Sequence, residues 1–250
     1  MNQANLLILV AVTLPPRSLN ALGDVTEERL VETPFGTVGP LALRTPAARP
    51  GQDSVASTWV LPYSGLPTRT DPRATIHAAM QLGVAYVLNW DEGVAVNPVL
   101  NRGQTVVPVD YIDWTRTLSA TFTATSVAAL TETTGHFEPP PAFDPTLVTR
   151  LAALLPHAPG VVYLGVDGPR RETPAEARMF RAWGADVLGQ NLIPEVILAK
   201  EVGLAYAGLV TVLGNSADQR AADPHGELRE GLEAVTAILP QLAWELGMGR

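Results

Sequence analysis

The sequence predicts an α/β fold, in which helices flank a mostly parallel sheet, over a single domain of residues 1–250. Short apolar runs rich in Val, Ile and Leu alternate with segments of helical spacing along the whole chain, as in strand–helix–strand units. Hydrophobic residues make up 46% of the 250 residues, which is enough to enclose one large core. The sequence shows no internal repeat and no linker long enough to divide the chain.

The N-terminal half predicts buried strands and one helix. Residues 6–12 are almost wholly apolar and stop shortly before Pro15 and Pro16, so we expect a central strand there. Residues 72–82 have helical spacing, and Gly83 is a suitable C-terminal cap. We expect a turn-rich segment at residues 31–36, a polar loop at 47–53, and strands at 55–61, 84–88 and 105–109.

In the C-terminal half, predicted strands also alternate with predicted helices. Thr173, followed three residues later by Glu176, predicts a capping box at the start of a helix over residues 174–183. A long helix is expected at the end of the chain, where Pro240 should kink or break it. We expect a loop at residues 115–135, strands at 161–166 and 206–213, and helices at 145–155, 193–202 and 226–246.

Composition excludes several classes of function. The net charge of −8 disfavours nucleic acid as a partner, because binding to phosphates needs a basic face. The chain has no cysteine, which excludes disulfides and thiol catalysis, and its four histidines are too far apart in sequence for a usual zinc motif. The apolar run at residues 6–14 is too short to span a bilayer, so we expect a cytoplasmic protein with no membrane partner.

Four segments in the C-terminal half carry a resemblance to a known family. They are Asp-Gly-Pro-Arg-Arg-Glu-Thr-Pro-Ala-Glu at 167–176, Trp-Gly-Ala-Asp at 183–186, Gly-Gln-Asn-Leu-Ile-Pro-Glu at 189–195 and Leu-Ala-Lys-Glu at 198–201. Together they resemble the core of the trimeric purine nucleoside phosphorylase and methylthioadenosine phosphorylase family. The resemblance implies a nucleoside phosphorylase-like fold with a mixed, barrel-like central sheet flanked by helices.

The resemblance also implies an activity. The expected enzyme is a homotrimer that cleaves the N-glycosidic bond of a purine nucleoside or methylthioadenosine, with phosphate as co-substrate and no metal or organic cofactor. In the family the position of Glu172 contacts the purine of 6-oxopurine enzymes. Arg171 stands where an aromatic residue is usual, and it could either stack on the base or pair with Glu172 or Asp167.

Further site residues follow from the same resemblance. Gln190 stands where a methionine usually packs on the ribose, and Asn191 where Ser or Thr lies next to ribose and phosphate. Asn215 is one residue beyond the family's Asn or Asp that stabilises the leaving base at N7, and it could equally be a turn residue. His225 matches a histidine at the ribose 5′-hydroxyl, and His136 matches a segment that enters a neighbouring subunit's 5′ pocket. Either histidine could instead be a surface residue.

The family's phosphate-binding pattern is largely missing. Of the glycine-rich loop after the first strand only Thr13 matches, and no basic residue stands at the second phosphate element, although Arg69 or Arg73 could compensate. Asp91 and Glu92 add carboxylates where a small-residue turn is usual. Three hypotheses remain: a phosphorylase with a rebuilt phosphate site, a nucleosidase in which Asp91 or Glu92 activates water, and a non-catalytic purine or nucleoside binder.

Overall fold

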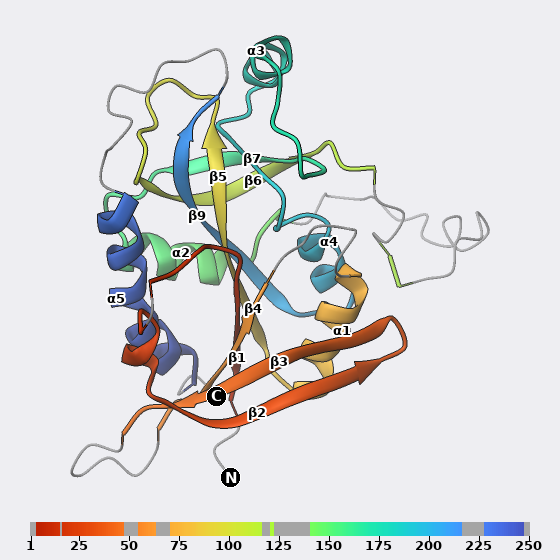
Figure 1. Ribbon diagram of the computed structural model, residues 1–250, viewed down its shortest axis with the longest axis vertical. Helices are drawn as coiled ribbons and strands as arrows, with labels where there is room; N and C mark the ends of the chain where they lie inside the picture. Colours follow the sequence, from red (N-terminus) through yellow and green to blue (C-terminus); the bar gives the residue numbers. More distant parts are fainter. Residues whose placement is uncertain are drawn as a thin grey trace.

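The computed structural model describes residues 4–15, 17–47, 55–63, 71–116, 121–122, 141–216 and 228–247. These residues form a nine-stranded sheet with the order β2-β3-β4-β1-β5-β8-β7-β6-β9. An additional pairing between β5 and β9 closes the last five strands into a barrel, which is extended on one side by the other four (Figure 1). The predicted α/β fold with a mixed, barrel-like sheet is confirmed.

The strands and helices have the following bounds. The strands are β1 (Leu6–Val10), β2 (Asp24–Thr33), β3 (Gly36–Thr45), β4 (Thr58–Pro62), β5 (Tyr86–Ala95), β6 (Thr105–Asp113), β7 (Gly160–Gly165), β8 (Val187–Gly189) and β9 (Ala205–Asn215). The helices are α1 (Pro72–Leu82), α2 (Pro145–Leu154), α3 (Pro174–Ala182), α4 (Glu195–Glu201) and α5 (Leu228–Gly247), with a short 3₁₀ turn, η1 (Asn20–Leu22).

Helices cover both faces of the sheet. Figure 1 shows α1 and α4 on one side and α2 and α5 on the other, and each pair is in mutual contact. Successive residues of β1 supply the two cores: Leu7 and Leu9 pack with the residues of α1 and α4, whereas Leu6 and Ile8 pack with those of α2 and α5. A strand that is covered on both faces has apolar side chains at every position, and this explains the unbroken apolar sequence of β1.

The helix starts follow the predicted local chemistry. Thr173 accepts a hydrogen bond from the Glu176 backbone N–H, and the Glu176 carboxylate accepts one from the Thr173 N–H, so the predicted capping box is present. Asp71 caps α1 in a similar way, by accepting from the backbone N–H of Arg73. At the other end of α1, Gly83 has φ 70°, the left-handed conformation expected of a glycine cap.

The structure corrects three of the predicted elements. The turn at residues 31–36 is the tip of a long β2–β3 hairpin, whose strands were missed because β2 is mostly exposed and lacks apolar alternation. The strand predicted to end at residue 88 is β5, which runs on to Ala95, so Asp91 and Glu92 lie within a strand. Of the two effects predicted for Pro240, the break is wrong: α5 continues past it to Gly247, with Leu239, Leu242 and Leu246 buried on its inner face.

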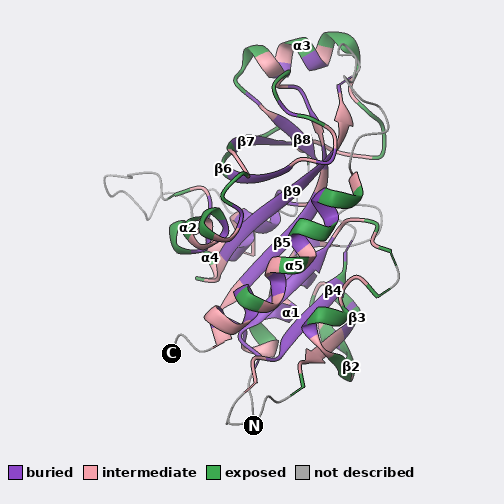
Figure 2. Cartoon of the chain, turned by 90° about the vertical axis from the view of Figure 1, so that its left-hand side faces the viewer, coloured by how far each residue is buried: buried purple, intermediate pink, exposed green. Residues whose placement is uncertain are grey.

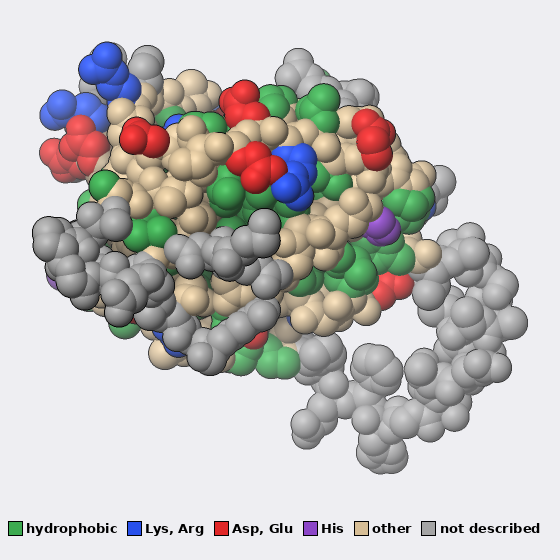
Figure 3. Space-filling view, turned by 90° about the horizontal axis from the view of Figure 1, so that it is seen from below, with side chains coloured by type: hydrophobic (Ala, Val, Ile, Leu, Met, Phe, Trp, Pro, Cys, Tyr) green, Lys and Arg blue, Asp and Glu red, His purple; other side chains and the backbone are tan. Residues whose placement is uncertain are grey.

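Burial is concentrated in the sheet. Figure 2 shows that β5 and β9 are buried along most of their length, whereas α3 lies at one end of the molecule and is largely exposed. On the face drawn in Figure 3, acidic side chains are interspersed with basic ones. Among the described residues, none of the helices is both long and apolar enough to cross a membrane.

Candidate active site

A cavity of about 240 Å³ lies at the end of the barrel where β5, β8 and β9 meet the segment that follows β7. Its wall includes residues from four separate parts of the chain, namely Glu92, Arg171, Glu172, Gln190, Asn191 and Gly214. The structure therefore brings together five of the residues that the sequence suggested for the site. We call this space the barrel-end cavity.

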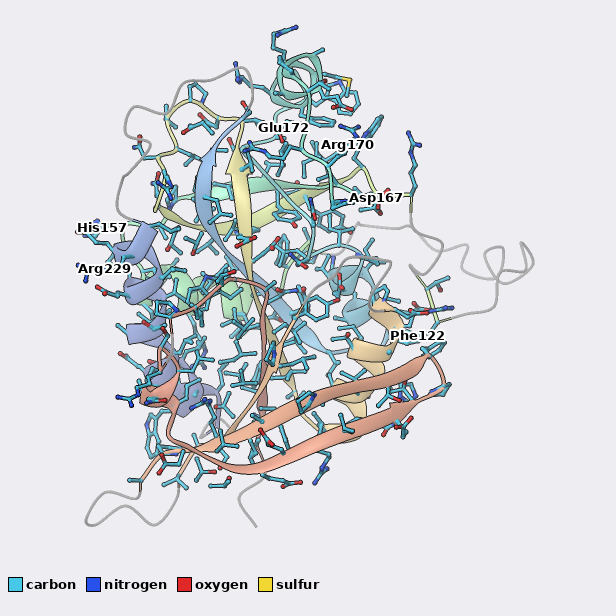
Figure 4. All side chains as sticks on the ribbon, in the orientation of Figure 1. Phe122, His157, Asp167, Arg170, Glu172 and Arg229 are labelled. Atoms are coloured by element: carbon cyan, nitrogen blue, oxygen red, sulfur yellow. The ribbon has the colours of Figure 1, made fainter. Side chains whose placement is uncertain are left out.

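Glu172 lines the barrel-end cavity, and its side chain is nearly buried. Its side chain is 6% exposed, whereas that of its neighbour Arg171 is 60% exposed. Arg171 Nη2 lies 3.1 Å from Glu172 Oε1 and also donates to the backbone oxygen of Asn215. The sequence left open whether Arg171 stacks on the base or pairs with Glu172 or Asp167. In the structure it pairs with Glu172. Figure 4 shows Glu172, Arg170 and Asp167 in the segment that joins β7 to α3.

Asp91 lies behind the cavity wall rather than in it. It is completely buried, and it accepts hydrogen bonds from Tyr163 Oη at 2.7 Å and from Asn191 Nδ2 at 2.5 Å. Burial raises the pKa of Asp91 to about 6 from an ordinary 3.8, although the hydrogen bonds from Asn191, Tyr163 and the Glu92 backbone oppose the rise. Asp91 therefore holds Asn191 in place and has no exposed atom with which to touch a ligand.

Glu92 is the carboxylate of β5 that reaches the barrel-end cavity. The parallel register of β1 and β5, which pairs Val10 with Trp90, brings the segment after β1 alongside Glu92. Partial burial raises the pKa of Glu92 above its ordinary value, and the nearby backbone N–H of Thr13 opposes the rise.

Asn215 lies at the rim, one residue beyond Gly214 of the cavity wall. Its side-chain Nδ2 donates to the backbone oxygen of Leu100 at 3.2 Å, and its own backbone oxygen accepts from Arg171. Of the other sequence-predicted site residues, Arg69, His136 and His225 lie outside the described residues.

Sequence reasoning missed two residues that support the site. Tyr163 of β7 is fully buried, and its hydroxyl donates to Asp91 and accepts from the Asn191 backbone N–H at 3.2 Å. A tyrosine in the middle of an apolar strand was the available signal, since a buried phenol needs a polar partner. Arg170 also lines the cavity, and the family resemblance gives this position no role.

Gly189 is expected to be essential to the floor of the barrel-end cavity. A Cβ at this position would lie 2.5 Å from Asp91 Oδ2 and 2.5 Å from the Tyr163 hydroxyl, two side chains that are fully buried. Gly189→Ala should therefore lower the free energy of unfolding by about 1–3 kcal/mol, the usual effect of overpacking. Gly214→Ala is the matched control, because its Cβ would meet no atom within 4 Å. Equal losses in urea unfolding of the two variants would contradict this account.

A larger cavity of about 460 Å³ lies between η1 and α5. Its lining residues include the apolar side chains of Leu22, Ala237 and Trp244. The described residues contain no cluster of three or more His, Asp or Glu side chains that could hold a metal ion. Five of the site residues that the sequence suggested line the barrel-end cavity, and none of them lines the cavity between η1 and α5.

Comparison with known proteins agrees with the geometry. A probable 6-oxopurine nucleoside phosphorylase from Moorella thermoacetica is 34% identical over 220 residues, which cover 84% of this chain and 80% of the relative. A probable S-methyl-5′-thioinosine phosphorylase from Methanopyrus kandleri is 34% identical over 195 residues, covering 72% of this chain and 69% of the relative.

The fold has a solved counterpart as well. A mutant of the adenosine/methylthioadenosine phosphorylase from Schistosoma mansoni, in complex with adenine, superposes with a TM-score of 0.79 at 22% identity, covering 98% of this chain and 91% of that one. The family model described as the phosphorylase superfamily matches residues 10–243. The resemblance seen in the sequence is confirmed, and the chain belongs to the phosphorylase superfamily, among relatives of the purine nucleoside and methylthioadenosine phosphorylase type.

Proposed function

We propose that this protein cleaves the N-glycosidic bond of a purine nucleoside bound in the barrel-end cavity. The observation that carries the proposal is the nearly buried Glu172 carboxylate, which shares one cavity with Gln190, Asn191 and Glu92. A carboxylate, two amides and a second carboxylate can contact a base, a pentose and an incoming nucleophile within one space. The names of the relatives support the same reaction class.

The chemistry of Glu172 favours a 6-oxopurine. An ionised carboxylate only accepts hydrogen bonds, and a 6-oxopurine offers the N1–H donor on the edge opposite the pentose, whereas adenine has an acceptor at N1. Two of the relatives agree, since 6-oxopurine nucleosides and S-methyl-5′-thioinosine both carry a 6-oxopurine. The proposed substrate is thus inosine, guanosine or a 5′-methylthio analogue.

The remaining residues are assigned by position. Gln190 and Asn191 would face the pentose, and Asn215, beside the cavity wall, is the candidate donor to N7 of the leaving base, where negative charge develops. His136 and His225 remain candidates for the 5′ group. Were phosphate the nucleophile, Arg69 and Thr13 would be its candidate contacts. The homotrimer stays a proposal, and sedimentation equilibrium should give three chain masses.

The test is base release from inosine, guanosine, adenosine and methylthioadenosine, with roughly 50 mM phosphate and with none, the higher concentration being well above typical KM values. We expect release of hypoxanthine and guanine in preference to adenine. Binding of these nucleosides without release of any base would contradict the proposal and favour a non-catalytic nucleoside binder.

A further inference from the structure

We propose that water, rather than phosphate, receives the pentose in the barrel-end cavity, with Glu92 as the general base that deprotonates it. The inference rests on the proposed cleavage reaction and names its co-substrate. It is drawn from the distribution of charge and of hydrogen-bond donors around the cavity. Three observations support it, and each concerns a different part of the cavity wall.

The first observation is the Glu92 carboxylate beside the end of β1. The parallel register of β1 and β5 pairs Val10 with Trp90, so the backbone of Thr13 lies next to Glu92, an anion that is part of the cavity wall. A phosphate ion would have to displace that carboxylate or lie against it, and two anions in a partly desolvated cavity repel strongly. A neutral water meets no such repulsion and can donate its proton to the same carboxylate.

The second observation is that the arginines of the described wall are already paired with carboxylates. Arg170 forms a bidentate pair with Glu176, with contacts of 2.6 and 2.8 Å, and Arg171 pairs with Glu172. Both guanidiniums belong to the segment between β7 and α3, which also carries the base-binding Glu172. Their positive charge is thus balanced on the side of the purine. Of the three β5 residues in the described wall, Glu92, Gly93 and Val94, the charged one is Glu92.

The third observation concerns the orientation of Asn191. Its Nδ2 donates to Asp91, and its backbone N–H also approaches Asp91, at 3.3 Å. Because Asp91 is fully buried and accepts these bonds, the amide nitrogen of Asn191 is turned toward the protein interior. Both donors of Asn191 thus approach the protein's own buried carboxylate rather than an incoming anion.

The reaction balances without a further reactant. Glu92 takes a proton from water while the water oxygen forms a bond to C1′ of the pentose. The C1′–N9 bond breaks, and its electron pair leaves with the purine, which takes up a proton from solvent. Glu92 then returns its proton to solvent, and the products are the free purine and the free pentose.

The test identifies the sugar product of the wild-type protein and of three variants. With inosine, we expect free ribose at a rate that does not change between zero and roughly 50 mM phosphate, a saturating amount at typical KM values. Glu92→Gln should lower kcat by about 10²- to 10⁴-fold, the usual contribution of a general base. The control is Glu28→Gln, which changes an exposed glutamate in β2. Its kcat should equal that of the wild type.

Chemical rescue separates a base from a structural residue. Glu92→Ala should regain activity when formate is added, because a small carboxylate can enter the vacated space, whereas Glu92→Gln should not. Thermal melts and calorimetric titration with inosine check that the variants fold and bind. Glu92→Gln with wild-type kcat would overturn the role of Glu92.

The remaining outcomes distinguish this inference from the proposed function. Base release that requires phosphate and yields ribose 1-phosphate would overturn the water mechanism and leave glycosidic cleavage standing. Binding of nucleosides without release in either condition would overturn both. Phosphate-independent release of ribose that is lost in Glu92→Gln and regained with formate in Glu92→Ala would support both.

Discussion

Glu172→Gln is expected to lower kcat/KM for inosine by about 10- to 150-fold, which corresponds to the 1.5–3 kcal/mol of a hydrogen bond to a charged group. The glutamine keeps the size of the side chain but loses its charge. If its amide NH₂ group faces N1–H of a 6-oxopurine, two donors meet and no hydrogen bond forms. The reason for a large effect is the burial of Glu172, whose side chain is only 6% exposed. Steady-state kinetics of base release measures it.

The same variant should change the preference between purines. A glutamine can donate to N1 and accept from the 6-amino group of adenine, so the ratio of kcat/KM for inosine to that for adenosine should fall. Glu230→Gln, at an exposed position in the first turn of α5, is the control for loss of one surface carboxylate. An equal loss for both nucleosides would contradict the assignment of Glu172 to the base.

Glu195→Gln is expected to have the largest effect on stability, and that effect should depend on pH. Glu195 is 1% exposed at the start of α4, where its Oε1 accepts a hydrogen bond from the Tyr63 hydroxyl. Its Oε2 has no hydrogen-bond partner among the described residues. Burial raises the pKa of Glu195 from an ordinary 4.5 to about 8.

The direction of the effect follows from the two pKa values. Between pH 4.5 and about pH 8, Glu195 holds a proton in the folded chain but not in the unfolded chain. Stability from this group is therefore complete below pH 4.5 and is lost as pH rises through 8, by about 5 kcal/mol in total. A neutral glutamine cannot ionise, so the variant should lack this loss.

Urea unfolding at pH 5 and pH 9 measures the difference. Asp91, whose pKa is also raised by burial, is present in both proteins, so comparing the two pH dependences isolates Glu195. We expect the wild-type protein to lose several kcal/mol more than Glu195→Gln between these two values. The same loss in both proteins would show that Glu195 is not protonated in the folded state.

Local chemistry explains which parts of the fold could be predicted from the sequence. The capping box at Thr173 and the glycine cap at Gly83 depend on residues within one turn, and both are present in the structure. The apolar run of β1 is buried on both faces, so its composition alone identifies it. The β2–β3 hairpin could not be found in this way, because its stability comes from pairing with a distant strand, β4.

The candidate site shows a similar division. Glu172, Gln190 and Asn191 lie in the segments that resemble the family, and the fold brings them into one cavity. The contrast between Asp91 and Glu92 could not be predicted, because only the continuation of β5 buries one side chain and directs the other into the cavity. A phenol within an apolar strand marks Tyr163 as a residue that needs a polar partner, but it does not identify that partner. Its contacts with Asp91 and Asn191 join β7, β5 and the segment after β8, which are far apart in sequence.

The most direct test of the central claim is a crystal structure with a purine C-nucleoside, in which a carbon–carbon bond replaces the N-glycosidic bond and prevents cleavage. Our account predicts a purine in the barrel-end cavity, with a ring N–H on the Glu172 carboxylate and the pentose between Glu92 and Asn191. A purine seated instead in the apolar cavity between η1 and α5, or contacting none of these residues, would contradict it.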